Sequence, residues 1–157
     1  MDNGKRSRSI RWANDRDESC VEEPLDYEEI SRYELRLVVS DGRYNASTHI
    51  SISISDVNDN PPQFSSPFYS VTLNEEEPPR TLLRVNASDR DGLLVNGKVI
   101  YRLEGQGAYL FRVEENGDIR TLQPLDRDPP HGVPVWNLVV QAVDQDGEGL
   151  VGYADVQ

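Results

Sequence analysis

Large apolar residues occupy alternate positions in two neighbouring stretches of the chain, Tyr33–Val39 and Ile50–Ile54. Successive side chains of a β-strand point to opposite faces, so each stretch predicts a strand with one buried face. Asp41, Gly42 and Asn45 lie between them and are residues typical of turns. The two stretches are therefore predicted to pair as antiparallel strands.

The same alternation returns later in the chain, from Trp136 to Ala142, where the inward stripe makes Trp136 a predicted core residue. Shorter β-like stretches are Tyr69–Leu73, Leu82–Ala87 and Val99–Leu103. No stretch shows the periodicity of an amphipathic helix. The pattern predicts an all-β protein, most simply a β-sandwich.

The chain also repeats itself. Pro24-Leu25-Asp26 recurs at Pro124-Leu125-Asp126, an offset of 100 residues, and the apolar stretch ending at Asp41 recurs before Asp144, an offset of 103. A period of about 100 residues is the length of one β-sandwich module. We therefore expect an atypical, disordered segment at 1–23, the C-terminal part of one module with its linker at 24–60, and a second module at 61–157 that lacks the end of its last strand.

The net charge of the chain and its lack of apolar segments restrict the kinds of partner and compartment that it can have. The chain has 28 acidic and 16 basic residues, a formal net charge of -12, which argues against nucleic acid and anionic membrane surfaces. No apolar run is long enough to span a bilayer, and the basic N-terminus lacks the apolar region of a secretory signal. The single Cys20 offers neither a disulfide framework nor a CxxC metal site.

Carboxylates and amides gather where the predicted strands end. They are Asp41, Asp56, Asn58, Asp59, Asn60, Asp89, Asp91 and Asp144. Clustered carboxylates repel one another, and a divalent cation removes that penalty. Calcium takes many carboxylate, amide and carbonyl oxygens in a flexible cage, magnesium retains more water, and zinc prefers His and Cys. The alternative is that these are ordinary turn residues. That explanation is adequate for any one of the turns, but it does not explain why the whole set recurs at matching positions.

These residues carry a resemblance to the cadherin family. The segment DVNDNPPQF (Asp56–Phe64) resembles the linker between cadherin repeats, as does ASDRDG (Ala87–Gly92). PLDYE and PLDRD resemble the L-D-R-E element, the strands ending in Asp41 and Asp144 resemble the Y-x-L-x-V-x-A-x-D element, and Glu75 resembles the early glutamate of a repeat. The resemblance covers Pro24–Gln157, and DQDGEGLVGYADVQ is similar to the large invertebrate neural-cadherin type.

The resemblance implies tandem Greek-key, immunoglobulin-like sandwiches, the first of them incomplete, with Ca²⁺ between successive repeats. The implied ligands of the shared linker are Asp26, Glu28, Asp56, Asn58, Asp59, Asn60, Asp89, Asp91, Asn96 and Asp144. Glu75, Asp126 and Asp128 would serve the next linker, and Asp41 the preceding one. Asp128 departs from the family pattern, which usually has Glu there, and the pattern is lost before Pro24 together with the early glutamate of the first repeat.

The resemblance further implies calcium-dependent, homophilic cell–cell adhesion. The expected partners are cadherin repeats of the same or a related protein on an apposed cell, with no nucleic acid and no small-molecule substrate. The chain is expected to be an extracellular part of a membrane-anchored protein of the plasma membrane. Asn45-Ala46-Ser47 and Asn86-Ala87-Ser88 match the N-glycosylation sequon.

Three alternatives remain. Asp144, Asp146, Gly149 and Asp155 match positions of an EF-hand loop, but the segment before them is strand-like and an EF-hand needs flanking helices. A carboxylate pair could serve a glycosidase-like enzyme, although no nucleophile–base pair stands out. A purely structural module without metal is the third alternative, and calcium binding at equilibrium would distinguish it.

Overall fold

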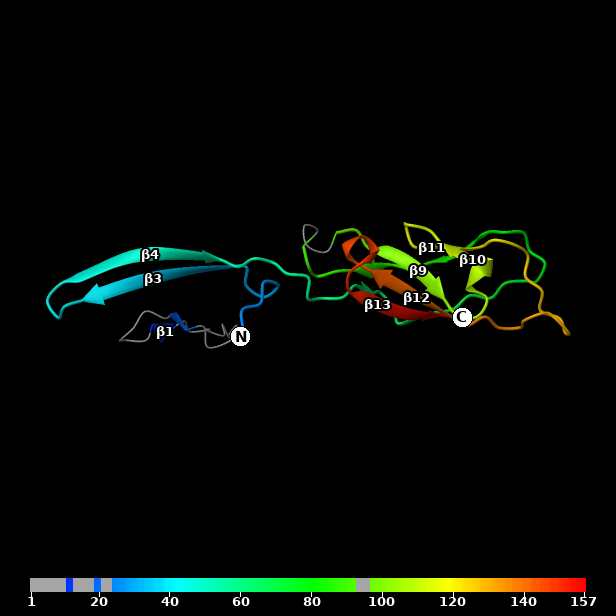
Figure 1. The fold of residues 1–157 in the computed structure, drawn as a ribbon, viewed down its shortest axis with the longest axis horizontal. Helices are drawn as coiled ribbons and strands as arrows, with labels where there is room; N and C mark the ends of the chain where they lie inside the picture. Colours follow the sequence, from blue (N-terminus) through cyan, green and yellow to red (C-terminus); the bar gives the residue numbers. More distant parts are fainter. Residues whose placement is uncertain (1–10, 13–18, 21–23, 93–96) are drawn as a thin grey trace, which may run out of the picture. The chain divides into compact units, whose positions relative to one another are not determined.

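The computed structural model describes residues 11–12, 19–20, 24–92 and 97–157, and its regular structure is almost entirely β-strand (Figure 1). The chain divides into two compact units, Met1–Asp56 and Val57–Gln157. The helical segments of the described residues are two short 3-10 turns, η1 (Ala108–Leu110) and η2 (Gln145–Gly147). No helix in the described ranges is long and apolar enough to cross a membrane. The all-β prediction is confirmed.

The first unit contains one long hairpin. Strand β3 (Arg32–Ser40) pairs antiparallel with β4 (Asn45–Ser53) in an unbroken register. The Asp41 carboxylate closes the turn between them, because its Oδ1 accepts the backbone N–H groups of Arg43 and Tyr44 at 2.8 and 2.7 Å. A smaller antiparallel pair joins β1 (Arg11–Trp12) and β2 (Ser19–Cys20).

The predicted inward face of the hairpin is only partly buried. Tyr33, Leu35 and Leu37 are half-buried on β3, and Ile52 and Ile50 stand opposite the first two on β4. At the tip of the hairpin the pattern fails, since Val39 is 62% exposed. Alternation along the strand therefore predicted the shared face but not where its burial ends.

The second unit contains two main sheets and a short strand pair. The four-stranded sheet has the order β6 (Phe68–Tyr69), β13 (Val151–Val156), β12 (Leu138–Val143), β9 (Ile100–Glu104). The three-stranded sheet has the order β10 (Phe111–Val113), β11 (Asp118–Thr121), β7 (Thr81–Arg84). Strand β5 (Gln63–Phe64) pairs with β8 (Ala87–Ser88). Among the strands that the structure describes in this unit, all pairings are antiparallel except that of β6 with β13, which is parallel.

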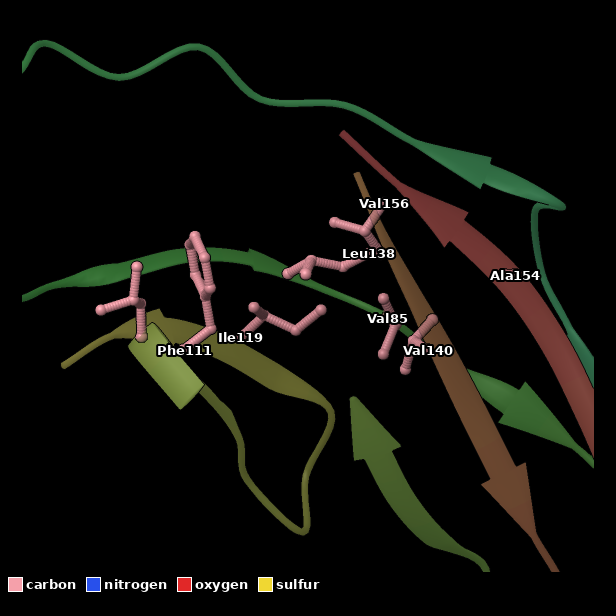
Figure 2. Packing of buried hydrophobic residues seen from close by; sticks show 8 residues of the cluster. Val85, Phe111, Ile119, Leu138, Val140, Ala154 and Val156 are labelled. Atoms are coloured by element: carbon pink, nitrogen blue, oxygen red, sulfur yellow. The ribbon is translucent and has the colours of Figure 1, made fainter. Parts of the chain in front are cut away.

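The apolar core of the second unit lies between its sheets. Leu138 and Val140 of β12 pack with Ile119 of β11 and Phe111 of β10, and Val85 joins them (Figure 2). Val140 is completely buried. Alternate residues of β12 thus fill the core, as the sequence pattern predicts for a strand with one buried face.

Three predicted strands differ from the observed ones. Strand β4 begins at Asn45, a predicted turn residue, and so starts five residues before the predicted stretch Ile50–Ile54. The stretch Leu82–Ala87 is divided into β7 and β8, because the chain leaves β11 after Arg84 and pairs with β5 instead. Regular pairing in the stretch predicted at Tyr69–Leu73 covers only Phe68–Tyr69. Trp136 lies before β12 and is half-buried rather than fully buried, with its ring edge-to-face on Phe111 at a centroid distance of 6.0 Å.

The prediction of a disordered segment at 1–23 falls mainly outside the described residues, as does the proposed ligand Asn96.

Candidate metal centre

One end of the second unit brings several of the predicted ligands together. The backbone N–H of Asn60 donates to Asp91 Oδ2 at 3.0 Å, and its side-chain amide donates to Asp91 Oδ1 at 2.7 Å and Asp59 Oδ1 at 2.8 Å. The backbone N–H of Asp91 donates to Asp89 Oδ1 at 3.0 Å. The linker segment and the D-x-D pair are therefore held against each other by direct hydrogen bonds.

Asp144 stands at the end of β12, inside a tight turn that encloses its side chain. Its backbone carbonyl accepts the N–H groups of Gly147 at 2.8 Å and Gly149 at 3.2 Å, while its Oδ1 accepts the N–H of Leu150 at 2.6 Å. The residue is 0% exposed. A carboxylate is rarely buried so completely unless another charge or a metal compensates it.

Gly149 allows the turn to pass this close to the carboxylate. A Cβ at this position would stand 3.1 Å from Asn58 Nδ2 and would overlap Asp144 Oδ1. Asn58 and Asp144 therefore lie on the same side of the turn. Because Asn58 and Asn60 belong to one short segment, Asp144 belongs to the same end of the unit as Asp89 and Asp91.

Three oxygen atoms at this end are buried and lack hydrogen-bond partners among the described residues: Asn58 Oδ1, Asp89 Oδ2 and Asp144 Oδ2. Buried polar atoms are normally hydrogen-bonded, and a buried carboxylate without a counter-charge is costly. Amide and carboxylate oxygens are the ligands of a hard divalent cation. The donor set therefore fits calcium, and no His or Cys among the named ligands favours zinc.

The first unit supplies a second group of acids. Carboxylate oxygens of Glu28 and Asp56 lie within 4.8 Å of each other. Asp26 is exposed, and its Oδ1 accepts the backbone N–H of Glu29 at 3.1 Å. Two carboxylates at the separation of Glu28 and Asp56 repel each other unless a cation or proton intervenes. This pair and Asp26 are the part of the predicted cluster that belongs to the first unit.

The ligands predicted for the neighbouring linkers lie elsewhere. Glu75, Asp126 and Asp128 are exposed at the end of the second unit that leads into β12, and the Asp128 N–H donates to Asp126 Oδ1 at 2.9 Å. Asp41 is exposed at the hairpin tip. The N–H groups of Tyr44 and Arg43, in that order of effect, lower the pKa of its carboxyl group. Glu75, Asp126 and Asp128 do not join the group around Asp144.

The EF-hand alternative is wrong. The turn after Asp144 is flanked by strands β12 and β13, whereas an EF-hand loop joins two helices. Asp155, which would be the last ligand of such a loop, is exposed within β13 and stands opposite Val139.

Sequence reasoning missed Gly149 and the backbone of Leu150 as parts of the candidate site. The run DQDGEGL contains a Gly at position 149 and so signals a turn, but the sequence does not show that the turn folds back over its own first carboxylate. Only the hydrogen bonds to Asp144 reveal that role.

Comparison with known proteins identifies the architecture. Residues 69–157 match the family described as "Cadherin domain". This chain belongs to the cadherin family. Cadherin-related hmr-1 of Caenorhabditis elegans is 53% identical to it over 141 residues, which cover 87% of this chain and 5% of that protein. Neural-cadherin of Drosophila melanogaster is 44% identical over 144 residues, covering 85% of this chain and 5% of that protein.

Solved cadherin structures agree. The structure of Protocadherin Gamma C5 EC1-3 gives a TM-score of 0.75 at 31% identity, covering 87% of this chain and 46% of that one. The crystal structure of Drosophila N-cadherin EC1-4 gives a TM-score of 0.69 at 28% identity, and the match covers 87% of this chain and 34% of that one. The resemblance to cadherins of the invertebrate neural type is confirmed. The enzyme alternative is wrong, because the cadherin family consists of adhesion proteins. The chain spans about a twentieth of the length of the curated relatives named above.

Proposed function

We propose that this cadherin segment binds calcium and takes part in calcium-dependent cell–cell adhesion. The observation that carries the proposal is the fully buried Asp144, whose Oδ2 has no hydrogen-bond partner among the described residues. Its Oδ1 is held by the Leu150 N–H, so the carboxylate is fixed in place before any ion arrives. A ligand fixed in this way loses little conformational entropy on binding.

Calcium would supply charge neutralisation. In the second unit the proposed ligands are Asn58, Asp59, Asn60, Asp89, Asp91 and Asp144, with Asn96 added from the sequence pattern. In the first unit they are Asp26, Glu28 and Asp56. Asp56 is the last residue of its unit and Asn58 lies two residues further along, so the two groups adjoin in the chain. With their repulsion removed, we infer that the linker stiffens.

The remaining acids extend the same scheme to neighbouring repeats. Glu75, Asp126 and Asp128 would bind calcium at the following linker, and Asp41 at the preceding one. Successive stiffened linkers would turn a row of repeats into a rod that presents its adhesive surface at a defined distance from the cell. We propose that the rod pairs with cadherin repeats of the same or a related protein on an apposed cell.

This function places the chain outside the cell, within a longer protein that is anchored in the plasma membrane. Synthesis would then pass through the secretory pathway, where sequons such as those at Asn45 and Asn86 become substrates for N-glycosylation.

Calorimetric titration with calcium tests the metal site. Wild-type chain should bind calcium, and Asp144→Asn should weaken binding by at least about tenfold, equivalent to about 1.4 kcal/mol. Asp155→Asn is the matched control, because Asp155 is an exposed acid on the strand that follows the same turn. No measurable binding, or equal effects of the two variants, would contradict the proposal.

Cell aggregation tests adhesion. Non-adherent cells that express the full-length protein should aggregate in calcium and disperse when calcium is chelated. Mixing them with differently labelled cells that lack the protein tests homophilic pairing. Aggregates containing both labels in proportion to the mixture would contradict homophilic pairing, and aggregation that survives chelation would contradict calcium dependence.

A further inference from the structure

The outer face of the four-stranded sheet exposes two aromatic rings. Phe68 of β6 is 50% exposed and Tyr153 of β13 is 62% exposed, whereas the residues that follow them, Tyr69 and Ala154, pack into the core. Phe68 stands beside Asp155, which lies two residues after Tyr153 on the same face of β13. The two rings therefore share one region of the outer face.

The strand register arranges the side chains of this region in two rows. The first row crosses the sheet through Phe68, Asp155, Val139 and Glu104. The second row crosses it through Tyr153, Gln141 and Arg102. Beyond them the turn η2 lies over Ile100, since a Cβ on Gly147 would stand 3.6 Å from Ile100 Cβ. The open part of the face therefore consists of these two rows.

Strand β9 places one acid and one base at the margin of the region. Glu104 and Arg102 are exposed and two residues apart, so they stand in adjoining rows. The Glu104 side chain makes no hydrogen bond or ion pair with any residue that the structure describes. Arg102 Nη2 donates to Gly147 O at 2.9 Å, which uses one of the five N–H donors of a guanidinium group. Both charges can therefore bind a partner.

The two rows are complementary to each other. A half-turn about an axis that crosses the strands between the rows places the first row of one copy on the second row of another. Glu104 then faces Arg102 of the second copy, Asp155 faces its Tyr153 hydroxyl, and Phe68 lies beside the same tyrosine ring. Such a contact is isologous, so each pair occurs twice. A half-turn about an axis along the strands would place each row on itself and leave Glu104 without a cation to face.

We propose that this face is the adhesive surface of the second unit and packs on the same face of a second copy. The proposal rests on the homophilic adhesion proposed above and names the surface that carries it. The half-turn reverses the strand direction, so the two chains run in opposite directions, as chains that project from apposed cells do. Phe68 and Tyr153 supply apolar contact, and the two pairs of Arg102 with Glu104 set the register.

This contact is weak in a single unit. Two rows of side chains form a smaller surface than a standard interface, which buries about 1,600 Å² in total. Several weak contacts in a row of repeats would act together, because the first contact raises the effective concentration of the others. Measurements on the chain therefore need high protein concentration.

Sedimentation equilibrium of the whole chain tests the interface. Wild type should form a reversible dimer, and Arg102→Glu and Glu104→Arg should each raise its dissociation constant at least about tenfold, because each variant sets two like-charged pairs face to face. An equimolar mixture of the two variants should dimerise as wild type does, since its facing pairs are again of opposite charge. Arg112→Glu makes the same change of charge on β10 of the other sheet and should have no effect.

General charge repulsion predicts a different result. The chain carries a net charge of -12, so repulsion alone would weaken association of Arg102→Glu and strengthen that of Glu104→Arg. Arg102→Glu also loses the bond to Gly147 O, and thermal unfolding of each variant shows whether the fold survives. Glu104→Arg removes no bond of the folded chain. A wild-type chain that stays monomeric, a mixture that associates no better than either variant, or an equal effect of Arg112→Glu would overturn the proposal.

The proposed function is read separately. Cells that aggregate in calcium while the chain stays monomeric would overturn this surface and leave the adhesive function standing. A chain that dimerises through this face but binds no calcium in calorimetry would contradict the metal site and leave the surface standing.

Discussion

At the scale of single residues, Gly149 sets the position of the Asp144 carboxylate. A Cβ at position 149 would overlap Asp144 Oδ1 and press on Asn58. The turn could accept it only by moving the carboxylate, and overpacking of this kind costs about 1–3 kcal/mol. The cost falls on the arrangement of oxygens that we propose to bind calcium.

Gly149→Ala should therefore weaken calcium binding by about tenfold, the equivalent of about 1.4 kcal/mol. Glu148→Ala is the control, since Glu148 is exposed in the same turn and uses only its backbone there. Calorimetry gives the affinity, and thermal unfolding in chelator gives the stability without calcium. Unchanged affinity, or a loss of calcium-free stability that accounts for the whole effect, would assign Gly149 a purely structural role.

The acids of the candidate site were predictable from sequence because Asp and Asn cluster at strand ends and recur one module later. The glycine and the backbone donor that enclose Asp144 were not, because their role depends on how a turn folds back in space. Trp136 was predicted as core from its place on an inward stripe. It is half-buried because it lies in the loop before β12, at the margin of the core, where its ring contacts Phe111 edge-to-face.

Trp136→Ala should lower the free energy of unfolding of the second unit by about 3 kcal/mol, the lower end for loss of a large aromatic residue. The ring packs on Phe111 and lies so close to Gly107 that a Cβ there would overlap it. The loss should be the same with calcium and with chelator in urea titrations, because the ring belongs to the apolar core. Tyr109→Ala, which removes a side chain that is 80% exposed, should have little effect. Equal effects of the two variants would contradict the packing role.

At the scale of elements, the apolar pattern predicted β3, β9 and β12 to within about two residues, whereas β4 begins at Asn45, five residues before the predicted stretch. Propensity and periodicity did not predict where a strand changes partner. The stretch Leu82–Ala87 reads as one strand because its apolar residues continue. It becomes two strands because Asn86 O accepts a hydrogen bond from Ser65, on the segment that leads out of β5.

The pairing of β7 with β11 includes an ion pair that responds to pH. Arg84 Nε and Nη2 donate to Asp118 Oδ1 and Oδ2 at 2.6 and 3.0 Å. The hydrogen bond from Arg84 lowers the pKa of the Asp118 carboxyl group in the folded chain. A lowered folded-state pKa means that the carboxylate stabilises the fold above the ordinary aspartate pKa. That contribution disappears as pH falls through the folded-state pKa.

Asp118→Asn should therefore be less stable than wild type at neutral pH, and the difference should shrink to nothing in strong acid. Urea unfolding across the acid range measures it. The effect is small because Arg84 is exposed. In an Arg84→Gln background the same substitution should change the pH dependence much less. A difference that stays constant with pH would show that the ion pair is not its source.

At the scale of the whole molecule, the core of the second unit is separate from the candidate metal site. Its core residues are apolar side chains between the two sheets, whereas the buried carboxylates stand at the strand ends. Removing calcium should therefore leave the second unit folded. In a Trp12→Phe background, the near-ultraviolet circular dichroism of Trp136 should persist in chelator. Its loss would show that calcium is needed for folding itself.

Calcium should instead control how freely the two units reorient. Fluorophores on Thr48→Cys and Tyr109→Cys, in a Cys20→Ser background, report the distance between units molecule by molecule. The distance distribution should narrow when calcium is added. With Asp144→Asn it should stay broad at the same calcium concentration. A distribution that calcium does not change would contradict the stiffening of the linker.

The parallel pairing of β6 with β13 determines how the second unit bears mechanical load. These strands are joined through the bonds Asp155 N to Pro67 O at 3.0 Å, Gln157 N to Tyr69 O at 2.9 Å and Val71 N to Gln157 O at 2.9 Å. Because the two strands run in the same direction, the start of β6 and the end of β13 lie at opposite ends of the pair. Tension that enters before β6 and leaves after β13 therefore pulls the two strands past each other. The bonds are loaded in shear and must break together, which suits the role in cell–cell adhesion proposed above.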